Sequence, residues 1–129
     1  MNAENRRLNA EDELASAAEA LREAEALFGL GMLRGAVSRG YYGLFHAVRA
    51  LLFSRGLEAK THGGVETLFH LHFIRANEVD PEWGVLFARL QGYRERADYG
   101  PAVGLSAAEV RGELDRVARF LELVRRRVG

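Results

Sequence analysis

The chain has 129 residues, of which 48% are hydrophobic, and this length predicts a single domain, residues 1–129, with one core. Its 18 basic and 18 acidic residues give no net charge, which excludes non-specific attraction to DNA or to an anionic membrane. The absence of cysteine excludes disulfides, thiolate nucleophiles and cysteine-ligated zinc.

Two long helices are predicted first, from apolar residues that recur at alternating steps of three and four. The first begins near Asn9, which resembles an N-cap with Asp12 three residues on. The second runs from about Met32 to Arg55, before Gly56 stops it. The core stripes are Leu14, Ala17, Leu21, Ala24 and Phe28 in the first helix, and Leu33, Val37, Tyr41, Leu44, Phe45, Val48 and Leu52 in the second.

A shorter third helix follows Thr61 and ends in the polar residues 75–78. Its apolar side comprises Val65, Leu68, Phe69, His72 and Phe73.

Two further helices have clear start signals. Asp80 and Pro81 are typical of a helix start, and Gly100 with Pro101 ends that fourth helix. Residues 106–109 form a capping box, after which apolar residues recur to the C-terminus. The stripes are Trp83, Leu86, Phe87, Leu90 and Tyr93, then Val110, Leu114, Val117, Leu121, Val124 and Val128. Short connections favour antiparallel neighbours, so we expect an all-α, up-and-down bundle of about five helices.

The second helix carries another stripe, displaced from the core stripe, that is both polar and aromatic: Ser38, Tyr42, His46, Arg49 and Phe53. One interpretation is that these residues are half-buried with satisfied hydrogen bonds. The other is that they form a dimer face or the wall of a binding site.

The four histidines do not predict a metal site. His70 and His72 are two residues apart and would point to nearly opposite sides of a helix. Glu66 lies one turn from both His62 and His70, but without the order of a zinc-protease helix. Glycine-rich phosphate loops and nucleophile elbows are also absent, so we expect neither a metal nor a cofactor.

Apolar runs such as residues 50–53 are far shorter than the ~20 residues that cross a bilayer. No charged segment followed by an apolar stretch indicates a signal peptide. We therefore expect a cytoplasmic protein without membrane contact.

The densest polar segment, residues 93–99, ends the fourth helix. Arg94 and Asp98 are four residues apart and can pair on one face, although a surface pair of this kind contributes only ~0.3–0.5 kcal/mol.

Three segments in order resemble signatures of a small prokaryotic branch of the HEPN family: residues 38–47 (SRGYYGLFHA), 60–65 (KTHGGV) and 94–99 (RERADY). The resemblance implies an up-and-down bundle that dimerises. Catalytic HEPN proteins carry an arginine followed four to six residues later by a histidine, and two copies meet across the dimer to cut RNA without metal. This chain has Arg94, but Tyr99 stands where that histidine would fall.

A tyrosine with a pKa near 10 is a poor proton acceptor at pH 7, whereas a histidine has a pKa near 6.5. We therefore expect a non-catalytic module. Its dimer groove, lined by Ser38, Tyr42, His46, Arg94, Asp98 and Tyr99, would hold a nucleotide, RNA or partner protein. The resemblance also implies a minimal nucleotidyltransferase as partner in a toxin–antitoxin-like pair.

Two alternatives remain open. The chain is a metal-independent endoribonuclease if the fold brings His46 or His62 beside Arg94, because either imidazole could then move protons. A purely structural dimer, in contrast, would show no ligand effect on stability.

Overall fold

The computed structural model describes residues 2–99 and 104–128, with residues 98 and 99 described by their backbone alone. Within these ranges the chain forms helices and no strand, which confirms the predicted all-α bundle. The helices are α1 (Ala3–Gly29), α2 (Leu33–Ser54), α3 (His62–Phe69), the π-helical turn η1 (His70–Ile74), α4 (Pro81–Tyr99) and α5 (Ala107–Val128).

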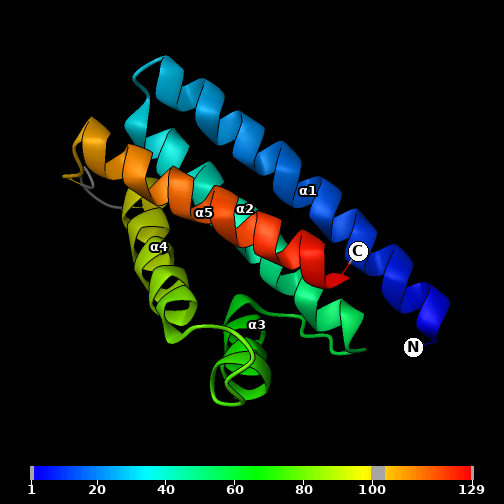
Figure 1. Cartoon of the computed structure of the whole chain (residues 1–129). Helices are drawn as coiled ribbons and strands as arrows, with labels where there is room; N and C mark the ends of the chain where they lie inside the picture. The colour runs from blue at the N-terminus through cyan, green and yellow to red at the C-terminus, as the bar shows by residue number, and fades with distance from the viewer. Residues whose placement is uncertain (1, 100–103, 129) are drawn as a thin grey trace.

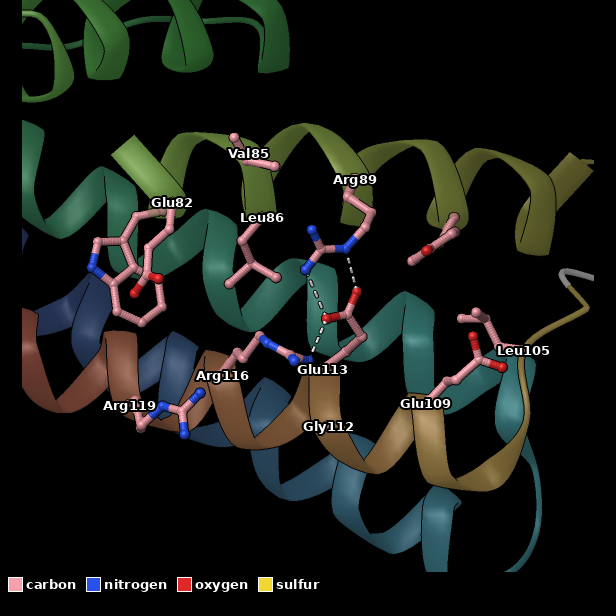
Figure 2. A pocket seen from close by; sticks show the side chains of 12 residues that line it. Glu82, Val85, Leu86, Arg89, Leu105, Glu109, Gly112, Glu113, Arg116 and Arg119 are labelled. Carbon is pink, nitrogen blue, oxygen red and sulfur yellow. Dashed lines mark hydrogen bonds and ion pairs between the residues drawn. The ribbon is translucent and has the colours of Figure 1, made fainter. Parts of the chain in front are cut away.

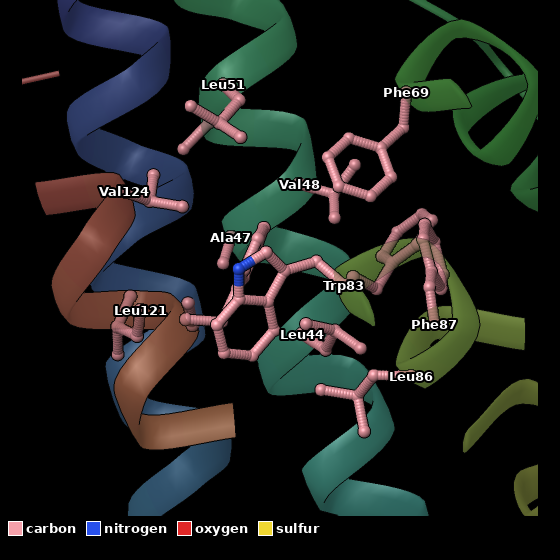
Figure 3. Close-up of a cluster of buried hydrophobic side chains, with 14 of the residues drawn as sticks. Leu44, Ala47, Val48, Leu51, Phe69, Trp83, Leu86, Phe87, Leu121 and Val124 are labelled. Atoms are coloured by element: carbon pink, nitrogen blue, oxygen red, sulfur yellow. The ribbon is translucent and has the colours of Figure 1, made fainter. Parts of the chain in front are cut away.

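Helix α2 is the centre of the bundle and packs against α1, α4 and α5 (Figure 1). Leu44, Ala47, Val48 and Leu51 of α2 belong to one core cluster with side chains of α3, α4 and α5 (Figure 3). Helices α1 and α2 pack closely at Gly43, where a Cβ would lie at the ordinary contact distance of 3.5 Å from the carbonyl oxygen of Ala17. Nearly all of the predicted α2 stripe is buried, which fixes the orientation of the displaced polar stripe.

The first helix begins earlier than predicted. Its N-cap is Asn2, whose side chain accepts a hydrogen bond from the Asn5 N–H at 2.8 Å. Glu4 in the first turn suits the positive end of the helix dipole. The prediction of a start near Asn9 was therefore wrong, because residues 3–8 form helix without an apolar period that would reveal it.

The third helix differs from its prediction in the last turn. The Arg75 N–H donates to the His70 carbonyl oxygen at 2.8 Å, five residues back, so the chain widens into η1. Asn77, at φ 59°, lies in the turn that follows. The widening places Leu71 at the surface and keeps Phe73 in the core.

The predicted starts of the last two helices are confirmed. Asp80 Oδ1 accepts a hydrogen bond from the Glu82 N–H at 2.9 Å. Ser106 and Glu109 bond reciprocally, side chain to backbone N–H, at 3.1 Å in both directions. No helix of the described residues is both long and apolar enough to span a membrane.

Candidate functional site

A group of rings lies where the start of α3 folds over the middle of α2. The hydroxyl of Tyr41 is 2.7 Å from Nδ1 of His62, the first residue of α3. The His62 ring stacks on Phe45 with centroids 4.2 Å apart and planes inclined by 12°. Tyr42 meets the His62 ring edge-on at 6.1 Å. The side chain of His62 is therefore held between residues of adjacent turns of α2.

Arg94 reaches the same rings from α4. Its guanidinium carbon lies 5.3 Å from the ring centroid of Tyr41 and 5.9 Å from that of Tyr42. Both distances fit cation–π contacts. Tyr41 thus contacts both Arg94 and His62, and we call Tyr41, Tyr42, Phe45, His62 and Arg94 the Arg94 cluster.

A second group of charges borders this cluster. One carboxylate oxygen of Glu13 in α1 lies 2.6 Å from Nδ1 of His46, and the other lies 3.3 Å from a guanidinium nitrogen of Arg49. The Glu13 side chain is only 14% exposed, so its charge is shielded from water by the two α2 residues. The ring of His46 also meets Phe45 edge-on at 5.6 Å. Helix α1 therefore supplies a carboxylate that orients the imidazole of His46.

The electrostatics of the site favour a neutral His62. Burial lowers the pKa of His62 below its usual value, and the nearby charges of Arg94, Arg49 and His46 lower it further. Burial also raises the pKa of Tyr41 far above that of an ordinary phenol, an effect that Arg94 only partly offsets. Tyr41 consequently stays protonated. The cations around His62 disfavour its charged form, while Glu66 and Glu95 act on the neighbouring Tyr41 with the opposite sign.

The fold gathers four of the residues singled out from the sequence, namely Tyr42, His46, His62 and Arg94. Ser38 is half-buried one turn before Tyr42 on α2.

The side chains of Asp98 and Tyr99 lie outside the described residues, so the pairing of Asp98 with Arg94 stays a prediction. The backbone of α4 is helical through position 99. On a continuous helix, positions 94 and 99 point to different sides, so the helical backbone does not bring them together over this segment.

Part of the predicted stripe on α2 requires correction. Phe53 is only 7% exposed and lies in the core, with the Arg49 guanidinium 5.3 Å from its ring centroid. The ring of Phe53 is therefore covered within the chain and does not contribute to a dimer face or a site wall.

Two members of the site were not anticipated. Tyr41 was assigned only to the core, and Glu13 was not singled out at all. Its position one turn before Ala17 on the first helix gave no indication that it would meet α2.

Among the described residues, no group of three or more histidine and acidic side chains is arranged to hold a metal ion. His70 lies close to α4, where a Cβ on Gly84 would come within 2.8 Å of its ring. His70 therefore belongs to the packing of η1 against α4 rather than to the Arg94 cluster.

Comparison with known families gives a match over most of the chain. A family model described as the HEPN domain matches residues 10–127, which include every residue of the Arg94 cluster. The chain belongs to the HEPN family. The resemblance that the three sequence segments indicated is thereby confirmed.

Relatives of this chain include proteins of bacteria and archaea. A UPF0332 protein of Thermotoga maritima is 33% identical over 108 residues, covering 84% of this chain and 82% of the relative. Two proteins of Methanocaldococcus jannaschii, each named "Putative toxin", are 36% identical over 83 residues and 34% identical over 93 residues. The matches cover 64% and 72% of this chain, and 62% and 63% of those relatives.

Proposed function

We propose that this HEPN protein is a toxin–antitoxin-like module that binds a phosphate of a nucleotide or of RNA at the Arg94 cluster. The family match and the names of the M. jannaschii relatives support the class of protein. The observation that carries the ligand class is the meeting of Arg94 and His62 on the ring of Tyr41, with Arg49 as a further cation near His62.

The residue types suit a phosphate next to a base or ribose. A guanidinium is the preferred side chain for phosphate recognition because it presents several planar donors. Tyr42 and His62 are half-buried, so each keeps part of its ring open. Base stacking on such rings contributes ~1–3 kcal/mol per base. A bound phosphate would also favour protonation of His62, which the surrounding cations now oppose.

The direct test replaces Arg94. Arg94→Ala should weaken binding of a labelled single-stranded RNA at least about tenfold, because a charge-assisted hydrogen bond is worth ~1.5–3 kcal/mol. Fluorescence polarisation measures the affinity, and urea unfolding measures stability. Arg7→Ala is the matched control, since Arg7 pairs only with Glu11 on the exposed side of α1. If Arg94→Ala unfolds the protein and leaves binding per folded molecule unchanged, Arg94 is structural.

A minimal nucleotidyltransferase and a second copy of this chain are the proposed partners. Co-expression with a nucleotidyltransferase encoded next to this gene should give a complex that survives size-exclusion chromatography. Separate elution of the two proteins would count against the partnership.

A metal-independent endoribonuclease is the second candidate. The observation that favours it is His62, which lies on the same ring as Arg94 and has a pKa lowered below its usual value. Such an imidazole could take the proton of a ribose 2′-hydroxyl as that oxygen attacks the adjacent phosphorus. The bond from phosphorus to the 5′-oxygen would break to give a 2′,3′-cyclic phosphate, and the departing 5′-oxygen would take a proton from water to leave as a hydroxyl. Arg94 would stabilise the charge on the phosphoryl oxygens.

Cleavage of RNA in the presence of a chelator separates the two candidates. The binding module predicts no cleavage above buffer. The ribonuclease predicts cleavage that both Arg94→Ala and His62→Gln abolish, while His72→Gln on η1 leaves it unchanged. A protein that neither binds nor cuts RNA, and whose stability no nucleotide changes, would be a purely structural dimer.

A further inference from the structure

A separate cleft lies between α4 and α5, and Arg94 is not among the residues that line it. Both helices pack on α2 but make few backbone contacts with each other, which leaves a cavity of about 550 Å³ (Figure 2). Leu86, Tyr93 and Leu105 give it apolar walls, and Val85 at its rim is 60% exposed. This volume is in the range of sites for small molecules, roughly 300–1,000 Å³.

The single tryptophan of the chain, Trp83, also lines the cleft. Its indole packs on Phe120 of α5, with ring centroids 5.2 Å apart. Trp83 is only 9% exposed, so an edge of the indole, rather than its face, borders the cleft. An apolar group in the cleft would therefore contact this edge and the exposed Val85 at the rim.

The middle of the cleft is positively charged. Glu113 is only 7% exposed, and both of its carboxylate oxygens bind Arg89, at 2.7 and 2.9 Å (Figure 2). Arg116 donates to the same carboxylate at 3.0 Å through one of its terminal nitrogens. One carboxylate thus faces two guanidinium groups, and one positive charge remains.

Arg119 adds a second positive charge one turn further along α5. It lines the cleft, and it has no hydrogen bond or ion pair within the described part of the chain. Of the other acidic residues, Glu109 accepts from the Ser106 N–H at the start of α5, and Glu82 lies in the first turn of α4. The lining as a whole has three arginines and three glutamates and so no net charge, and within it Arg116 and Arg119 place two positive charges one turn apart on α5.

We propose that this cleft binds a small organic anion, with its phosphate or carboxylate on Arg116 and Arg119 and an apolar group beside Val85 and the edge of Trp83. Arg89 and Glu113 form the floor that holds Arg116 in place. The site does not depend on the Arg94 cluster, because none of its lining residues belongs to that cluster.

The test uses phenyl phosphate as the probe and the fluorescence of Trp83, the only tryptophan, as the readout. Titration of the full chain should give a saturable change with a Kd of about 1 mM or tighter. Inorganic phosphate should compete. Arg119→Gln should weaken binding about tenfold, as expected for one charge-assisted hydrogen bond, and Arg116→Gln should do the same.

Two controls make the result specific to the cleft. Arg126→Gln also removes an arginine from α5, but Arg126 is 79% exposed and lies outside the cleft, so the affinity should not change. Arg94→Ala should also leave the titration unchanged, which separates this site from the proposed function.

The proposal is overturned by any of three results. These are the absence of a saturable change, equal binding of uncharged benzyl alcohol, and an Arg119→Gln affinity equal to that of the unmodified chain. Because Arg119 has no role in the core, its variant keeps the test valid even if Arg116→Gln fails to fold.

Discussion

Replacement of Glu13 by glutamine should make the protein less stable and its phosphate binding tighter. The carboxylate holds His46 and Arg49 at 2.6 and 3.3 Å in a largely buried position. Glutamine keeps the shape but turns charge-assisted contacts, worth ~1.5–3 kcal/mol, into neutral ones worth ~0.5–1.5. We expect the free energy of unfolding to fall by about 1–2 kcal/mol. Loss of a negative charge near the cluster should tighten RNA binding roughly two- to fourfold.

Urea unfolding and fluorescence polarisation at the same pH and salt measure the two effects. Glu11→Gln is the matched control, because Glu11 lies on the same helix but is 54% exposed and pairs only with Arg7. Such a surface pair contributes ~0.2–1 kcal/mol or less, and its loss should not change the binding. If Glu13→Gln weakened binding in proportion to stability, Glu13 would be a scaffold residue, and the electrostatic account of the site would be wrong.

Three further predictions concern acid stability, helix capping and assembly. Because the pKa of His62 is lower in the folded than in the unfolded chain, the unfolded chain binds more protons, and stability should fall as the pH drops below about 6.5. His62 contributes at most ~1.4 kcal/mol per pH unit to this change in the free energy of unfolding. The His62→Gln variant should lose this contribution, as urea unfolding at several pH values would show. Ser106→Ala removes the reciprocal cap of α5 and should cost about 1 kcal/mol in urea unfolding, whereas a change near zero would mean that water replaces the cap. Light scattering at micromolar concentration should give the mass of a homodimer, and a monomer would count heavily against an interface that includes the end of α4.

Local signals in the sequence were sufficient for most of the fold. The caps at Asp80 and Ser106 depend on residues two or three positions away, and the structure contains both. The start of α1 was missed because the cap at Asn2 precedes a polar segment, so no apolar stripe marks the first turns. The π-helical turn at His70 was also not predicted, since one extra residue in a turn leaves no clear mark on a short apolar pattern.

The candidate site depends on contacts between distant segments, which a pattern within one helix does not predict. His62 meets Tyr41 only because the loop after α2 returns α3 over that helix. The available signal for Tyr41 was that it directly precedes Tyr42, a member of the polar-aromatic stripe. Its place in the core stripe already explained it, so it was not assigned to the site. Glu13 became part of the site through the packing of α1 on α2, and its partner His46 is 33 residues away.

The most direct test of the central claim, that the Arg94 cluster binds phosphate, is an NMR titration of His62. The pKa of the His62 ring should lie below its usual value in the free protein and should rise when a single-stranded RNA oligonucleotide is bound, because a phosphate offsets the field of Arg94 and Arg49. In Arg94→Ala the free pKa should be higher and the response to RNA should be much smaller. An unchanged His62 pKa in the presence of saturating RNA would contradict the account.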